Sequence, residues 1–376
     1  MDYIQSYSHS NKRPTCDEIS SFARQRAALT KAIDDVNKLK RRLAARARAL
    51  NFALSPIRRI PDDLLGYIFD FCVSDGHDNP HMDPASPPWS LTGVCQTWRA
   101  VSTASSGLWS SFSISDTRYV MLGSRYSSLD SYVSAVKRTS QLSQQRPLRI
   151  QLLDIDSMSP DYHSFGMNII ASLSETATAS RIRSLRVISK FSVIRAVSGM
   201  LLPSLENLEI KLLLPRMGPN PEEDFSRPIS FNFENAPKLR RYKEGHSHQA
   251  EINMPWAQLT HSCLYHQSFV HVPKLRDVEV LILNGQDGQF AELQDHRVVL
   301  PRLRCLEIVS RHSPALPGRI PTTVFECFDI PALDELKITS IQTLGPNEPM
   351  DAFFAAFIVF SPFFGACPSC CSFTLR

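Results

Sequence analysis

The first regular pattern along the chain is a seven-residue repeat of apolar positions between residues 17 and 54. The repeating column consists of Phe22, Leu29, Val36, Leu43 and Leu50, with either Ala32 and Leu39 or Ile33 and Ala47 at companion positions. The segment has no Gly or Pro and is rich in residues that lose little on entering a helix. We therefore predict a long helix over residues 17–54, preceded by a disordered tail over residues 1–16. The seam needs cover, either from a second copy or from the same chain.

A second pattern, between residues 57 and 112, predicts three short amphipathic helices. Residues 60–72 place Pro61 at the first helical position and two acids, Asp62 and Asp63, in the first turn. Apolar positions recur every three or four residues through this stretch and again through residues 89–102. The apolar pair Leu108 and Trp109 follows, and a Pro-rich loop separates the first two helices.

Beyond residue 113 a Pro-x-Leu motif recurs, usually with apolar residues three and five positions after the Leu. Its copies occupy residues 202–210, 236–244, 272–280, 300–308 and 330–338. The spacing of three and five is half of a leucine-rich-repeat strand, in which alternate side chains face the core. The pattern predicts an irregular, leucine-rich-repeat-like solenoid of parallel strands over residues 113–376. A mixed α/β domain in which the motif recurs by chance is the alternative. The predicted fold class is α+β or α/β in either case.

The order of motifs in residues 57–112 resembles the F-box, in the form with a long Pro-rich insertion that is similar to F-box-like proteins of mushroom-forming fungi. The resemblance rests on six residue pairs, Ile60-Pro61, Leu64-Leu65, Ile68-Phe69, Val94-Cys95, Trp98-Arg99 and Leu108-Trp109. It implies docking onto a Skp-type adaptor of a cullin-RING (SCF-type) ubiquitin ligase. About 50 residues cannot bury all of these apolar side chains internally, so part of the stripe must meet a partner. The implied adaptor-binding residues are Ile60, Pro61, Leu64, Leu65, Ile68, Phe69, Val94, Cys95, Trp98, Leu108 and Trp109.

A repeat region behind an F-box implies that residues 113–376 hold the target protein. Repeat proteins bind macromolecules along one extended face. The candidates for that face are variable positions beside the repeated Leu residues, represented by Glu206, Arg240, Arg276, Arg304 and Asp334. They carry both signs of charge, so no single target chemistry is indicated.

The net charge of +4 conceals an asymmetry. Residues 1–59 hold 13 Lys and Arg against five acids, which leaves the rest of the chain net acidic. The alternative function is therefore a coiled-coil interaction or nucleic-acid-binding protein that uses the basic helix. We do not expect a nucleic-acid partner, because no aromatic residues are interleaved with these cations.

No motif in the sequence predicts an enzyme. There is no Gly-x-Ser-x-Gly, no His-Glu-x-x-His and no phosphate-binding Gly-rich loop. A group of His and Cys between residues 246 and 271 lacks the paired spacing of a zinc site, and Cys367, Cys370 and Cys371 lack a partner pair. We predict neither a cofactor nor a metal.

The remaining composition favours an intracellular protein, in the cytoplasm, the nucleus or both. The chain opens without an apolar signal region, and its nine Cys form no disulfide framework. The most apolar run, residues 353–366, is too short to span a bilayer, so we expect no membrane partner. We expect the solenoid to lack its polar terminal cap, as in a truncated chain, because residues 351–364 read as a helix with little polar face.

Overall fold

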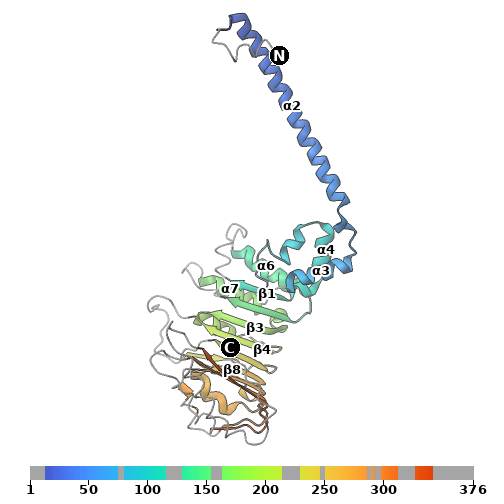
Figure 1. Ribbon diagram of the computed structural model, residues 1–376. Helices are drawn as coiled ribbons and strands as arrows, with labels where there is room; N and C mark the ends of the chain where they lie inside the picture. The colour runs from blue at the N-terminus through green and yellow to red at the C-terminus, as the bar shows by residue number, and fades with distance from the viewer. Residues whose placement is uncertain are drawn as a thin grey trace. The chain divides into compact units, whose positions relative to one another are not determined.

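A computed structural model of the chain describes residues 13–74, 80–115, 129–153, 163–213, 229–245, 250–285, 289–290, 293, 298–311 and 327–341. The chain divides into two compact units, Met1–Leu64 and Leu65–Arg376. The fold is mixed α/β, with a long N-terminal helix and a parallel sheet, as predicted (Figure 1).

The long helix of the first unit, α2, spans Cys16–Leu54 and confirms the prediction to within one residue. It begins with a capping box, in which the Glu18 backbone N–H donates to Thr15 Oγ1 and the Thr15 N–H donates to Glu18 Oε2 at 2.7 Å. None of its 39 residues is buried. A short 3₁₀ helix, η1 (Pro56–Arg59), follows α2.

The helices that follow α2 differ from the prediction at one point. α3 spans Asp62–Ser74, but residues 89–102 do not form one helix. They form a 3₁₀ helix, η2 (Trp89–Gly93), and an α-helix, α4 (Gln96–Ala104), separated by an extended Cys95. Gly93 is a poor helix former, and the Arg99 Nε donates back to the Thr92 carbonyl at 2.9 Å. Another 3₁₀ helix, η3 (Ser106–Trp109), carries the predicted Leu-Trp pair.

Nine parallel strands form the main sheet of the second unit, and they pair in the order in which the chain visits them. These strands are β1 (Ser111–Ser115), β2 (Leu148–Leu153), β3 (Ile182–Ser189), β4 (Asn207–Leu212), β6 (Arg241–Gly245), β8 (His261–Tyr265), β9 (Val280–Gly285), β11 (Cys305–Arg311) and β13 (Glu335–Ile341). Two small parallel sheets pair β5 (Ile229–Asn232) with β7 (Ala250–Asn253), and β10 (Val298–Val299) with β12 (Phe328–Asp329).

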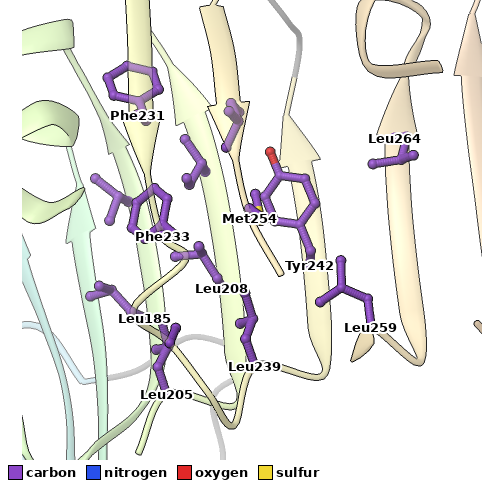
Figure 2. Close-up of a cluster of buried hydrophobic side chains, with 14 of the residues drawn as sticks. Leu185, Leu205, Leu208, Phe231, Phe233, Leu239, Tyr242, Met254, Leu259 and Leu264 are labelled. Atoms are coloured by element: carbon purple, nitrogen blue, oxygen red, sulfur yellow. The ribbon is translucent and has the colours of Figure 1, made fainter. Parts of the chain in front are cut away.

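One hydrophobic core lies on a single side of the main sheet. The first inward row of the sheet holds Phe112, Ile150, Leu185, Leu208, Tyr242, Ser262, Leu281, Leu306 and Leu336, which the strand register aligns. Figure 2 shows part of this row beside Phe231 and Phe233 of the β5 segment. The other cover elements are α6 (Leu129–Leu142), α7 (His163–Leu173), α8 (Thr176–Ala179), α9 (Phe191–Ser198), η5 (Trp256–Gln258) and η6 (His266–Lys274).

The repeated proline has a specific place in this fold. In each Pro-x-Leu copy, the Leu N–H donates to the carbonyl of the residue before the Pro, for example Leu205 to Leu202 at 3.1 Å and Leu239 to Ala236 at 3.1 Å. The proline is thus the second residue of a β-turn, where its fixed φ is favourable. The turns therefore refine the prediction: Pro belongs to a turn before the strand rather than to the strand entrance itself.

One copy of the motif departs from the predicted register. Four of the strands begin two residues after the motif Leu, but β9 begins at Val280, five residues after Leu275. Val278 is fully buried and takes the position that Leu303 occupies before β11. The inward residues of β9 are consequently Leu281 and Leu283, and not Val280 as the motif predicted.

The Pro-rich insertion after α3 is also partly ordered. His81 forms a parallel bridge with Ser113 of β1, and the Ser113 N–H donates to the Pro80 carbonyl at 2.8 Å. Met82, the next residue, is buried in the core. The insertion therefore covers the edge of the first strand, which would otherwise expose unpaired backbone groups.

We expect Arg181→Ala to lower the free energy of unfolding by about 2 kcal/mol, because the guanidinium of Arg181 satisfies several backbone carbonyls at once. It donates to the carbonyls of Ser140 (2.7 Å), Ala177 (3.1 Å) and Gln144. Urea denaturation followed by circular dichroism measures the change. Arg183→Ala is the control, since the exposed pair of Arg183 with Glu206 contributes below about 1 kcal/mol. Equal effects of the two substitutions would contradict this role of Arg181.

Candidate functional site

Apolar residues occur on two sides of α3, and only one side belongs to the core. Leu65 and Phe69 are buried, whereas Leu64 and Ile68 are 54% and 43% exposed. Phe71 is also exposed and lies seven residues after Leu64, so helical periodicity places it on the same side as Leu64 and Ile68. We call these three residues, Leu64, Ile68 and Phe71, the α3 apolar stripe.

The buried motif residues hold the short helices together. The ring of Phe69 meets that of Trp98 edge-on, with centroids 4.9 Å apart. Trp109 donates its indole N–H to the Ser102 carbonyl at 2.7 Å and contacts Trp89 edge-on at 6.0 Å. Such aromatic contacts bury large apolar areas while satisfying the polar atom of Trp. These residues act as a scaffold.

The predicted adaptor-binding residues thus fall into three groups. Pro61, Leu64, Ile68 and Val94 are exposed, and Ile60, Cys95 and Trp98 are half-buried. Leu65, Phe69, Leu108 and Trp109 are almost fully buried. The prediction of direct contact needs correction for these last four residues, because they leave no surface to a partner.

Phe71 was missed by the sequence reasoning, which assigned one stripe to α3. Its spacing of three residues from Ile68 and seven from Leu64 was the available signal. The ring of the neighbouring Tyr67 packs edge-on against Phe71 with centroids 4.9 Å apart. Tyr67 thus extends the aromatic surface beside the stripe.

The predicted target-binding residues meet at one end of the main sheet. Glu206, Arg240, Arg304 and Asp334 all precede their strands by one position. Backbone hydrogen bonds join neighbouring members of this row. The Arg240 N–H, for example, donates to the Glu206 carbonyl at 2.9 Å. Arg276 is the exception, because the three extra residues of its copy leave it in the turn. Glu279 occupies the row position instead.

The side of the main sheet opposite the core carries charges that separate along the sheet. Outward positions of β2 to β6 hold five cations, Arg149, Arg186, Lys211, Arg241 and Lys243, and the carboxylate Glu209. Glu209 lies 3.2 Å from Arg186 Nε and 3.4 Å from Lys243 Nζ. Outward positions of β11 and β13 hold Glu307, Glu335 and Lys337. The basic excess therefore belongs to the first half of the sheet, a separation that the sequence motif alone did not reveal.

A buried carboxyl lies on the core side of β6. Glu244 occupies the second inward row, where neighbouring strands carry Ile210 and Leu264. Burial raises the pKa of Glu244 to about 7, although hydrogen bonds from the Tyr265 N–H and the Ser268 hydroxyl, each 3.0 Å long, lower it. Burial, and then the charges of Glu244 and Cys263, raise the pKa of Tyr242. These bonds join β6 to the end of β8 and to η6, which is a structural role.

The described part of the His and Cys group does not form a metal centre. The ring of His271 stacks on Trp256 with centroids 4.4 Å apart, and burial followed by the charge of Lys274 lowers the pKa of His271 to about 4. Among the described residues, no three His, Cys, Asp or Glu side chains gather as metal ligands would. His246 and His248 lie outside the described residues.

Other predictions also fall outside the described residues. These concern the tail up to residue 12, the apolar segment 351–364 and the group Cys367, Cys370 and Cys371. In the described part of the chain, no helix combines the length and apolarity needed to cross a bilayer. No protein-family model matches the sequence, and no curated protein is detectably similar to it.

Proposed function

We propose that this chain is the non-catalytic target-recognition subunit of a cullin-RING (SCF-type) ubiquitin ligase. Residues 57–112 bind a Skp-type adaptor as an F-box, and residues 113–376 bind the target as a leucine-rich-repeat-like solenoid. The observation that carries the proposal is the α3 apolar stripe. Three large apolar side chains stay exposed on α3, while the buried members of the same motif form the scaffold behind them.

Binding a protein partner through this stripe would be energetically favourable. Interfaces concentrate their binding free energy in a few aliphatic and aromatic anchors near the centre. Leu64, Ile68 and Phe71 supply such anchors, and exposed apolar residues that cluster rather than scatter mark interaction surfaces. The F-box resemblance supplies the identity of the partner as a Skp-type adaptor.

The repeating turn-and-strand units support a solenoid for the target-binding region. Each described strand of the main sheet pairs with the main-sheet strands before and after it. Four of the five Pro-x-Leu turns bury their Leu fully, and Leu333 in the fifth turn is half-buried. The row that begins at Glu206 and ends at Asp334, together with the basic excess on β2 to β6, is the surface we assign to the target.

Co-purification of the full chain with a Skp-type adaptor tests the proposal. We expect a stable complex between the two purified proteins in size-exclusion chromatography. A chain without residues 1–56 should still bind the adaptor if residues 57–112 carry the interaction. If neither chain binds, the ligase proposal fails, and if only the shortened chain fails, recognition lies in α2.

A further inference from the structure

The long helix α2 exposes most of an apolar seam, and none of its residues is buried. Leu29, Ile33, Val36, Leu43 and Leu50 are each between 55% and 64% exposed. Helices in proteins gain most of their stability from packing an apolar face, and a 39-residue helix (about 58 Å) offers a long face to pack. The exposed seam therefore calls for a partner helix of similar length.

The seam follows an alternating step of three and four residues along the whole of α2. Its positions are Ile19, Phe22, Arg26, Leu29, Ile33, Val36, Lys40, Leu43, Ala47, Leu50 and Leu54. This is the spacing of coiled-coil core positions. Two of these positions, Arg26 and Lys40, are cationic, and their placement decides which pairing is possible.

A parallel pair of α2 helices brings like charges together. In register, Arg26 of one copy faces Arg26 of the second copy, and Lys40 faces Lys40. The second half of α2 adds to this repulsion, because residues 36–54 contain six cations and no acid. Like charges in direct opposition destabilise a helix pair.

An antiparallel pair removes these repulsions and places each cation of the seam opposite an apolar residue of the second copy. With Ile33 opposite Val36 of the second copy, Arg26 faces Leu43 and Lys40 faces Leu29. The same register sets Ile19 opposite Leu50, and the large Phe22 opposite the small Ala47. The basic half of each helix then lies beside the other copy's first half, which holds four acids among seven charges. We propose that two copies of the chain pair through α2 as an antiparallel coiled coil.

The polarity of the pair determines where the rest of each chain begins. Antiparallel helices end at opposite ends of the pair, so the two copies continue into residues 55–376 about 58 Å apart. The dimer thus presents its two copies at separate ends. This inference does not depend on adaptor binding.

Charge substitutions at Leu43 in the full chain test the polarity. In the antiparallel pair Leu43→Glu meets Arg26 of the second copy, and Leu43→Lys repels it, so we expect the Lys variant to dimerise about tenfold or more weakly than the Glu variant. Leu29→Glu and Leu29→Lys, which face Lys40, should behave in the same way. Sedimentation equilibrium measures the mass against the 42.4 kDa of one chain.

The control for these substitutions is a position on the other side of α2. Ala45 lies on the opposite side of the helix, so Ala45→Glu and Ala45→Lys should both leave the dimer intact. A parallel pair predicts that Leu29→Glu dissociates the pair as strongly as Leu29→Lys, because each residue then faces its own copy among the mixed charges of the first half, and that result would overturn the proposal. A monomeric mass for the unmodified chain across micromolar concentrations would also overturn it.

Discussion

Replacing Leu64 and Ile68 together by alanine is expected to weaken adaptor binding about 100-fold or more. Each truncated anchor of an interface centre costs roughly 2 kcal/mol or more of binding free energy. Both side chains are exposed, so the melting temperature of the chain should hardly change. Isothermal titration calorimetry with a purified Skp-type adaptor, alongside thermal denaturation, gives both numbers.

The neighbouring positions on the same helix provide the control. Phe69→Ala removes a fully buried ring that contacts Trp98, and we expect it to cost about 3–5 kcal/mol of folding stability. The two variants therefore separate contact with a partner from support of the fold. Unchanged adaptor affinity in the Leu64 and Ile68 double variant would remove α3 from the proposed interface.

Folding stability is expected to fall between about pH 4.5 and pH 7 through the single carboxyl of Glu244. Burial raises the pKa of this carboxyl to about 7 in the folded chain, from the 4.5 that is usual for a Glu side chain. Below pH 4.5 the Glu244 carboxyl is protonated in both the folded and the unfolded chain, so the free energy of unfolding is highest there. As the pH rises, the unfolded chain ionises first, so stability is lost progressively. The loss is complete above pH 7 and amounts to about 3 kcal/mol.

Glu244→Gln tests this dependence with nearly the same shape. The amide keeps an oxygen to accept the Tyr265 N–H and a donor for the Ser268 hydroxyl. We expect the variant to be more stable than the unmodified chain at pH 8 and to differ little at pH 4. Chemical denaturation at several pH values measures the difference. Glu251→Gln, at an exposed position of β7, is the control, and parallel pH profiles for all three chains would refute the prediction.

The long helix was predictable from sequence because three local signals agreed over residues 17–54. The segment lacks Gly and Pro, it is rich in residues that lose little on entering a helix, and its apolar positions repeat. The capping box of Thr15 and Glu18 at its start was a signal that the sequence prediction did not use. The break within residues 89–102 was not predictable in the same way. Its apolar spacing continues across Gly93, whose low helix propensity is a weak signal by itself, and the hydrogen bond from Arg99 to the Thr92 carbonyl becomes visible only in the folded chain.

The candidate surface on α3 shows why sequence alone could not divide partner contacts from core. Leu64 and Leu65 are chemically identical neighbours, and Ile68 and Phe69 are both large and apolar. Hydrophobicity therefore gives no reason to turn one of each pair outward. The decision comes from Trp98, which reaches Phe69 from another helix.

The positions of the row that we propose for target binding were largely predictable, because Pro-x-Leu fixes where four of the five strands begin. The row position falls at Glu279 and not at Arg276, because nothing local shows that Val278, three residues after the turn residue Leu275, is the buried residue two positions before β9. Strand register depends on partners that are distant in sequence, and the pairing of Val280 with both His261 and Cys305 settles it.

The agreement between strand order and chain order has a consequence for how this protein is made. Every strand of the main sheet after β1 finds its preceding neighbour already synthesised when it leaves the ribosome. Assembly can then advance one strand at a time, because each new strand pairs with the main-sheet strand just before it. We expect a chain still attached to the ribosome to have its first strands already paired, with the most recently made strand forming the open edge of the sheet.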